Sequence, residues 1–306
     1  MMSTHLRRLT AIIFAVWLPT VAEAVPNFSS ADVPYRTYVQ GPWGQIHVRV
    51  AGPANGPTIL LLHKMFWTSV EFEKVQPLLA SRNIRTIAVD LPGYGLSDPP
   101  PSEPSASAYA DALVPVLNAL HARRVFVLGV DTGSSVALAF AVAHPDRVQR
   151  LIFDGAPIFD AAIARKLIAA PHFDRAGQPD GTEFSRRWQA ISASVQPGAL
   201  SLENIHVSML QFFQAAPSYW WAHDAIFKYD FATNLKHVQA TGMVLSFRGG
   251  ALHPQEAQFI TLRPDYRLVP IDAGAYLMPS FDAPDAWARA VGDYVLSTPE
   301  PAREHG

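Results

Sequence analysis

Residues 125–140, Val125-Phe126-Val127-Leu128-Gly129-Val130-Asp131-Thr132-Gly133-Ser134-Ser135-Val136-Ala137-Leu138-Ala139-Phe140, join two runs of different character. The first run, 125–130, is β-branched and aromatic, which predicts a buried strand. The second run is small at 133–135 and then apolar at helical spacing, which predicts a helix. A single residue, Asp131, is left for the corner between them.

Gly129 and Gly133 flank Asp131 at two residues on either side. A sharp strand-to-helix corner needs such small neighbours, because its central residue is held in a strained backbone conformation. The spacing is that of a nucleophile elbow with aspartate at the centre, and it predicts Asp131 at the carboxyl edge of a parallel sheet. The alternative is an ordinary helix start with Asp131 as its N-cap.

The composition narrows the class of protein. The chain has 306 residues, 49% of them hydrophobic and 16% charged, which suits one large globular domain or a core with an inserted lid. A net charge of -2 without a long basic run argues against nucleic-acid binding. The absence of cysteine excludes disulfides, thiolate metal sites and cysteine nucleophiles. The histidines form no His-Glu-x-x-His pair, so we expect no metal and no cofactor.

The first 24 residues are expected to be an export signal. Arg7 and Arg8 precede an apolar run over 9–21, and Ala22-Glu23-Ala24 fits a small-x-small cleavage pattern. The run is shorter than the roughly 20 apolar residues of a membrane span. We expect a periplasmic or secreted protein that begins at Val25, with an uncleaved anchor as the alternative and the choice between Sec and twin-arginine export open.

Strands and helices are predicted to alternate along most of the chain. The expected strands are 35–39, 45–50, 58–63, 84–90, 125–130, 148–154, 242–248 and 266–272. The expected helices are 69–81, 106–122, the helix after the elbow, 254–261 and 284–296. This order predicts an α/β core, residues 25–154 and 241–299, with a mostly parallel eight-stranded sheet and helices on both faces. Residues 155–240 are aromatic-rich and predict an inserted helical lid.

Motifs outside the elbow support a specific resemblance. A buried strand ends in His63, and Asp90-x-Pro92-Gly93-Tyr94-Gly95-x-Ser97-Asp98 follows the next strand. With the elbow and the lid position, the chain resembles an α/β-hydrolase over nearly all of the expected mature sequence. An aspartate at the elbow makes it similar to epoxide hydrolases and haloalkane dehalogenases. The predicted signal and Ala156-Pro157-Ile158 are most similar to secreted bacterial epoxide hydrolases.

The resemblance implies a covalent mechanism, in which the aspartate attacks an electrophilic carbon and a histidine then activates water to cleave the ester. It implies Asp131 as nucleophile, backbone N–H groups of Thr132 and Met65 as oxyanion donors, and Tyr229 and His172 as lid residues for ring opening. The residues expected to line the substrate pocket are His63, Lys64, Phe66, Trp220 and Tyr276, of which His63 is expected mainly to brace the oxyanion loop.

The chain also departs from the family pattern. Ala275 stands where the catalytic histidine is expected, and the turn at 247–252, one usual place of the acid, has no carboxylate. The other usual position of the acid is Gly155, and the preceding Asp154 is expected to face away, because one step along a strand reverses the side chain. Thr132 replaces the tryptophan that stabilises halide in the dehalogenases, which argues against dehalogenation.

Three interpretations stay open. The protein is an epoxide-type hydrolase of a small apolar electrophile that has rebuilt its base from Asp154, His253 or Lys64; or a lyase or cyclase on this fold; or a non-catalytic binder with an apolar pocket. Lys64 replaces the family glycine and is either a solvated loop charge or a pocket residue that contacts Asp131. The partner is expected to be a small molecule, and the oligomeric state stays open.

Overall fold

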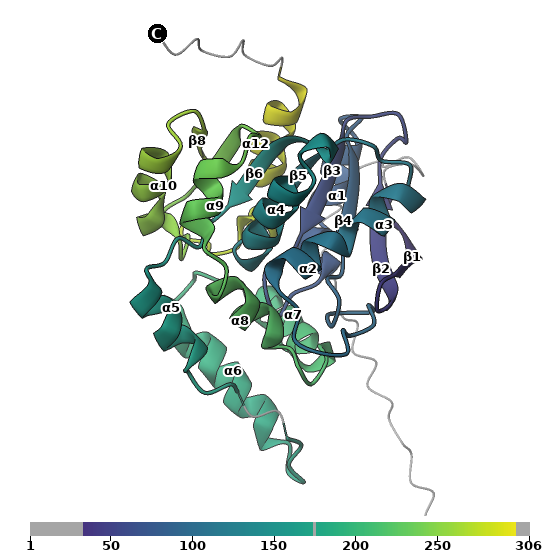
Figure 1. Ribbon diagram of the computed structural model, residues 1–306. Coiled ribbons are helices and arrows are strands. Elements are labelled where there is room, and N and C mark those ends of the chain that lie inside the picture. The colour runs from purple at the N-terminus through teal and green to yellow at the C-terminus, as the bar shows by residue number, and fades with distance from the viewer. Residues whose placement is uncertain (1–32, 174–175, 298–306) are drawn as a thin grey trace, which may run out of the picture.

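The computed structural model describes residues 33–173 and 176–297, so the predicted export signal lies outside the described residues and stays a prediction. Within the described residues, the strands form one eight-stranded sheet in the order β1-β2-β4-β3-β5-β6-β7-β8 (Figure 1). Their bounds are β1 Tyr35–Gly41, β2 Gly44–Ala51, β3 Thr58–Leu62, β4 Arg85–Val89, β5 Val125–Val130, β6 Val148–Asp154, β7 Gly242–Ser246 and β8 Arg267–Pro270. Each coincides with a predicted strand to within a few residues.

The sheet is antiparallel at one side and parallel elsewhere. β2 pairs antiparallel with β1 and β4, whereas the pairs from β4 through β3, β5, β6 and β7 to β8 are parallel. β3 is buried along its whole length, as the apolar run 58–62 predicts for a strand covered on both faces. All the parallel strands therefore end at one edge of the sheet, and Asp131 follows directly after β5 at this edge.

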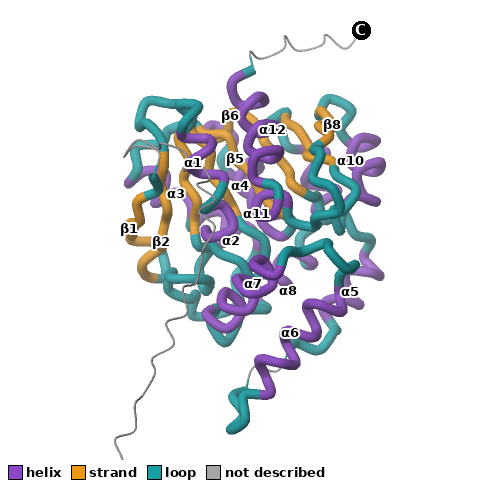
Figure 2. Tube along the Cα trace, turned by 180° about the vertical axis from the view of Figure 1, so that it is seen from behind, coloured by secondary structure: helices purple, strands orange, loops and turns teal. Residues whose placement is uncertain are grey.

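Helices cover both faces of the sheet. The helices before the lid are η1 Ser69–Phe72, α1 Val75–Ala80, α2 Ala106–Asp111, α3 Leu113–Ala119, α4 Thr132–Ala143 and η2 Pro145–Arg147. Those after the lid are η3 His253–Gln255, α10 Glu256–Leu262, α11 Pro279–Asp282 and α12 Pro284–Leu296. One core cluster joins the sheet to α2, α3 and α4, and a second joins it to α1 and α12 on the opposite face (Figure 2).

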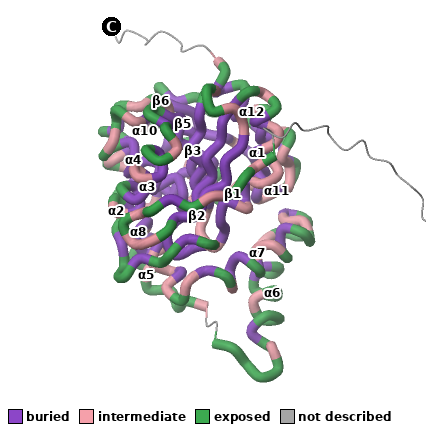
Figure 3. Tube along the Cα trace, turned by 90° about the vertical axis from the view of Figure 1, so that its right-hand side faces the viewer, coloured by how far each residue is buried: buried purple, intermediate pink, exposed green. Residues whose placement is uncertain are grey.

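The segment between β6 and β7 is helical, as the sequence predicts. It contains α5 Ala161–Ile168, α6 Thr182–Ser194, α7 Leu202–Gln214, α8 Trp221–Phe227 and α9 Phe231–His237. α6 extends away from the sheet and is largely exposed (Figure 3), whereas Phe231 and Leu235 of α9 belong to the core cluster around α4. α9 therefore packs against the sheet layer, and α5–α8 lie over the carboxyl edge. No helix in the described ranges is both long and apolar enough to cross a membrane.

Candidate active site

The elbow is strained and tightly packed. Asp131 has φ 48° and ψ −109°, outside the conformations that a non-glycine residue ordinarily adopts. A Cβ on Gly129 would lie 2.4 Å from the backbone of Gly133, and a Cβ on Gly133 would lie 2.2 Å from the carbonyl oxygen of Leu62. Both positions therefore require glycine, because strand β3 and helix α4 approach the corner without room for a methyl group.

Asp131 lines a small cavity of about 90 Å³ at the carboxyl edge of the sheet. Its walls come from the loops after β3, β5, β6, β7 and β8. The lining residues are Lys64, Val130, Asp131, Asp154, Gly155, Leu245, Phe247, Gly250, Ala251, Leu252, His253, Glu256, Leu277, Met278, Pro279 and Ser280. The cavity thus lies between Asp131 and the loops after β7 and β8, in which position 275 is alanine and the turn at 247–252 has no carboxylate.

Asp154 is adjacent to Asp131 across the sheet. The Asp131 backbone N–H donates to the Asp154 carbonyl at 2.9 Å, and Val130 pairs with Asp154 in the strand register. The Asp154 carboxylate accepts from the indole Nε1 of Trp287 at 2.7 Å, on the α12 face of the sheet. The Asp154 side chain thus turns toward α12, and Asp154 is also among the residues that line the cavity.

Lys64 lines the cavity beside both aspartates, so the structure brings Lys64 and Asp131 together in one pocket. Its backbone N–H donates to Oε2 of Glu71 at 2.9 Å, and the Ser280 hydroxyl donates to Oε1 of the same carboxyl at 3.2 Å. We call Lys64, Glu71, Asp131 and Asp154 the charge cluster. Glu71 was not predicted as a site residue; the only sign in the sequence was a carboxylate within the predicted helix 69–81.

Burial dominates the acidity of the charge cluster. Desolvation raises the pKa of Glu71 to about 7 and that of Asp154 to about 6, while the Lys64 ammonium and hydrogen bonds act in the opposite direction. Burial also raises the pKa of Asp131, against the opposing effects of Lys64, His223 and the Thr132 N–H. The cluster therefore holds protons near neutral pH, and Lys64 favours the charged form of each carboxyl.

The expected oxyanion donors are arranged differently from the family pattern. The Met65 N–H donates to the hydroxyl Oγ1 of Thr132, so a side chain of the elbow already occupies this donor. The Thr132 N–H faces the carboxyl of Asp131 itself, where it lowers the Asp131 pKa. An oxyanion formed beside Asp131 would have to displace the Thr132 hydroxyl to reach the Met65 amide.

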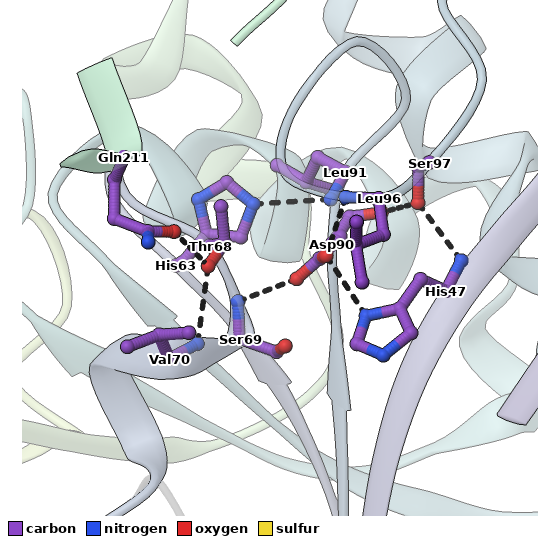
Figure 4. Close-up of polar contacts among 10 residues, drawn as sticks. All are labelled: His47, His63, Thr68, Ser69, Val70, Asp90, Leu91, Leu96, Ser97 and Gln211. Atoms are coloured by element: carbon purple, nitrogen blue, oxygen red, sulfur yellow. Dashed lines mark hydrogen bonds and ion pairs between the residues drawn. The ribbon is translucent and has the colours of Figure 1, made fainter. Parts of the chain in front are cut away.

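His63 braces the loop. Its Nε2 accepts from the Leu91 N–H at 3.0 Å (Figure 4), which puts the ring proton on Nδ1. Nδ1 donates to the Lys64 carbonyl at 2.8 Å. Burial lowers the pKa of His63, so the ring is neutral. Asp90 fixes the neighbouring loop, because its carboxylate accepts from the N–H groups of Ser69 and Leu96 at 2.7 and 3.0 Å.

None of the aromatic residues expected in the pocket is among the residues that line the cavity. Phe66 has φ 68° and packs on Phe212 at 5.3 Å between ring centroids. Trp220 stacks on His172 at 4.8 Å. Tyr229 lines a separate hollow with residues 103–107, where its hydroxyl is buried without a hydrogen-bond partner. The structure therefore places Tyr229 and Asp131 in different hollows.

The loop expected to carry the catalytic histidine turns outward. Ala275 is exposed, and Tyr276 is outside the cavity lining, which the loop reaches only from Leu277 onward. On the opposite wall, His253 Nδ1 lies 2.9 Å from Oε1 of Glu256, whose other oxygen accepts from Ser246 at 2.6 Å. His223 of the lid was not predicted as a site residue, but its charge acts on the Asp131 carboxyl. Its Nδ1 lies 3.0 Å from the carboxylate of Asp224.

Comparisons with known proteins agree with this architecture. Residues 57–196 match the family model of the alpha/beta hydrolase fold. Epoxide hydrolase 2 of Siraitia grosvenorii is 37% identical over 111 residues, 35% of this chain and 34% of that protein. An uncharacterized protein of Mycobacterium bovis is 38% identical over 125 residues, 40% of this chain and 36% of that protein. The chain thus spans about a third of the length of these curated relatives.

A solved structure extends the likeness to most of the chain. A hydrolase from Pseudomonas aeruginosa PA01 superposes with a TM-score of 0.71 at 21% sequence identity, over 86% of this chain and 98% of that one. At this identity the superposition shows the fold alone. The sheet order, the elbow and these comparisons together show that the chain has the α/β-hydrolase fold.

Proposed function

We propose that the protein is a hydrolase of epoxide type, in which Asp131 attacks a small apolar electrophile and forms an alkyl ester. The observation that carries this proposal is the strained elbow, which presents the Asp131 carboxyl to a cavity that also holds the Lys64 ammonium. The Lys64 ammonium favours the ionised form of this carboxyl against the effect of burial, and only the ionised form is a nucleophile. The volume of about 90 Å³ favours a small substrate.

In the first step an Asp131 oxygen bonds to an epoxide carbon while the bond from that carbon to the ring oxygen breaks. The released alkoxide takes a proton, for which Lys64 is the candidate donor because its ammonium lines the same cavity. Solvent then restores the proton of Lys64. Tyr229 and His172, the lid residues that the resemblance implies for ring opening, are not among the residues that line this cavity.

The covalent step can be tested by intact-mass spectrometry during incubation with 1,2-epoxybutane. A mass increase equal to the epoxide, mapped to the peptide that contains Asp131, is expected for the wild type at early times. Asp131→Asn should show none. Asp146→Asn, the same change at an exposed residue of η2 before β6, should behave as the wild type. An unchanged adduct in Asp131→Asn would contradict the proposal.

A second candidate, an acid–base enzyme such as a lyase or cyclase, is favoured by one observation. The Thr132 hydroxyl occupies the Met65 N–H, whereas the charge cluster holds protons near neutral pH. Such an enzyme would release product from its substrate without an Asp131 adduct and without oxygen from water. Ligand binding with neither adduct nor product would instead favour a non-catalytic binder.

A further inference from the structure

We infer that Asp154 is the general base that hydrolyses the ester on Asp131, in place of the histidine that position 275 lacks. This inference rests on the proposed function, because it concerns the second step of that reaction. It follows from the position of Asp154 next to the nucleophile, from its fixed side chain and from its place in the cavity wall.

The position is set by the sheet. Asp154 is the last residue of β6 and Asp131 follows the last residue of β5, and the two are joined by the N–H to carbonyl hydrogen bond of 2.9 Å. Asp154 and Asp131 therefore stand at the ends of neighbouring strands of the sheet, and the backbones of neighbouring strands lie about 4.8 Å apart. Both residues line the same cavity, so a water molecule bound there would lie beside both of them.

The side chain is held for this role. The Trp287 indole donates to Oδ2 of Asp154, which leaves Oδ1 for a water molecule. Trp287 is fully buried in the core cluster with α1 and α12, so the donor has little freedom to move. A general base acts through such a positioned acceptor, and its pKa is best placed near the working pH. The Asp154 pKa of about 6 meets this condition.

The other titratable groups in or near the cavity are less suited to act as the base. Lys64 carries a positive charge among carboxyls and accepts no proton while it is charged. Glu71 is a neighbour of Asp154 but is not part of the cavity lining. His253 is exposed and paired with Glu256 on the wall formed by the β7 loop. His223 lies on the lid, outside the lining residues.

The step is balanced. Asp154 takes a proton from water as the water oxygen bonds to the ester carbon Cγ of Asp131. The tetrahedral intermediate then collapses, the bond between Cγ and the alkyl-bearing oxygen breaks, and this oxygen takes the proton back from Asp154. The diol leaves with one oxygen that came from Asp131, and Asp131 retains one oxygen from water.

The test is a single turnover of 1,2-epoxybutane in H₂¹⁸O with the full-length chain. In the wild type the adduct should form and decay, and the Asp131 peptide should gain one ¹⁸O. Asp154→Asn keeps the oxygen that accepts from Trp287, and it should form the adduct but slow its decay by roughly 10²–10⁴-fold, the usual effect of a general base. Asp146→Asn is the matched control and should decay as the wild type.

A measurement on the wild type keeps the test independent of folding. The decay rate should fall as the pH is lowered through about 6, because protonated Asp154 cannot accept a proton. An adduct that decays equally fast in Asp154→Asn, or that is stabilised by His253→Gln instead, overturns the inference. A wild-type adduct that never decays also overturns it but leaves the proposed nucleophile standing. Product formation without any adduct would instead contradict the proposed function.

Discussion

At the scale of single residues, the site depends on two glycines without side chains as much as on the carboxyl of Asp131. Asp131 is held at φ 48° because Gly129 and Gly133 let β3, β5 and α4 meet around it. Strain of this kind persists only where the surrounding packing determines the conformation. The elbow should therefore tolerate changes at Asp131 better than changes at its glycines.

Gly133→Ala tests this directly. The added methyl would lie 2.2 Å from the carbonyl oxygen of Leu62, so backbone must move, and overpacking of this kind costs about 1–3 kcal/mol or more. We expect a lower midpoint in urea unfolding followed by circular dichroism. Gly177→Ala is the control, because its nearest atom would be a flexible Glu183 oxygen at 3.9 Å. Equal midpoints for the two variants would refute the packing argument.

Thr132 is predicted to restrain the oxyanion site. Thr132→Val removes the hydroxyl that accepts from the Met65 N–H at similar volume, so the amide becomes available to the tetrahedral intermediate. Since one such donor is typically worth roughly 10²–10³-fold in rate, decay of the Asp131 adduct should accelerate at least several-fold. Thr132→Ser keeps the hydroxyl and should match the wild type. Slower decay in the valine variant would show that the hydroxyl assists the reaction.

The residue types at the elbow could be predicted from the sequence, but their partners could not. Spacing alone predicts the corner, because only glycine fits on both sides of it. Glu71 lies 60 residues before Asp131 in the sequence and still further from Asp154. Its carboxyl is held by the backbone N–H of Lys64, in the loop after β3, and by the Ser280 hydroxyl of α11, and the sequence shows neither contact. Alternation along the strand predicts the direction of the Asp154 side chain, but it does not reveal that Asp154 also lines the cavity.

At the scale of elements, strands were easier to predict than helix lengths. The predicted helix 69–81 is split into η1 and α1, and the predicted helix 106–122 into α2 and α3. Pro77 and Pro115 explain the breaks, since each is the third residue of the later helix and lacks the N–H that would continue the hydrogen bonds of the earlier one. α12 matches its predicted range of 284–296, because Pro284 begins it.

The lid is tethered to the core by a few polar contacts that the sequence does not reveal. The Tyr94 hydroxyl donates to the carbonyl of Tyr219, the Ala216 N–H donates to the carbonyl of Gly93 at 2.9 Å, and the Thr68 hydroxyl donates to Gln211 of α7. These contacts hold α7 and α8 to the loops after β3 and β4.

Tyr94→Phe should loosen this attachment. The change removes one buried hydrogen bond between the lid and the core, worth about 1 kcal/mol. Amide hydrogen exchange in residues 216–229, followed by mass spectrometry, should become several-fold faster while exchange in β3 and β5 is unchanged. Tyr38→Phe, on exposed β1, serves as control. Unchanged exchange over 216–229 would mean that apolar packing alone holds the lid.

At the scale of the whole molecule, the alternation of apolar strands and amphipathic helices was enough to predict the α/β architecture. A parallel sheet with both faces covered needs continuous apolar strands, and β3, β4 and β5 are buried throughout. The same burial makes the ionised forms of buried carboxyls less favourable. It places the carboxyls of the charge cluster in a region where their charged forms are disfavoured.

The stability of the protein should therefore fall as the pH rises through the window set by this cluster. Burial raises the Glu71 pKa from 4.5 to about 7, so between these values the folded state retains a proton that the unfolded state has released. The contribution is fully present below about 4.5 and is lost as the pH approaches 7. Asp154, raised to about 6, acts in the same direction. Asp90, whose pKa is lowered, loses its contribution only at more acid pH.

Glu71→Gln isolates this effect. Glutamine stays neutral, can accept from the Lys64 N–H and can donate to Ser280, so it preserves the packing of the protonated acid. The free energy of unfolding of the variant should match that of the wild type near pH 5 and exceed it at pH 8 by up to about 3 kcal/mol, since one pKa unit corresponds to 1.36 kcal/mol. Urea unfolding across pH 5–8 measures this, with Glu203→Gln on the surface as control. A variant that is less stable than the wild type at pH 8 would show that ionised Glu71 is held favourably by Lys64, and that the Lys64 attraction outweighs the cost of burial.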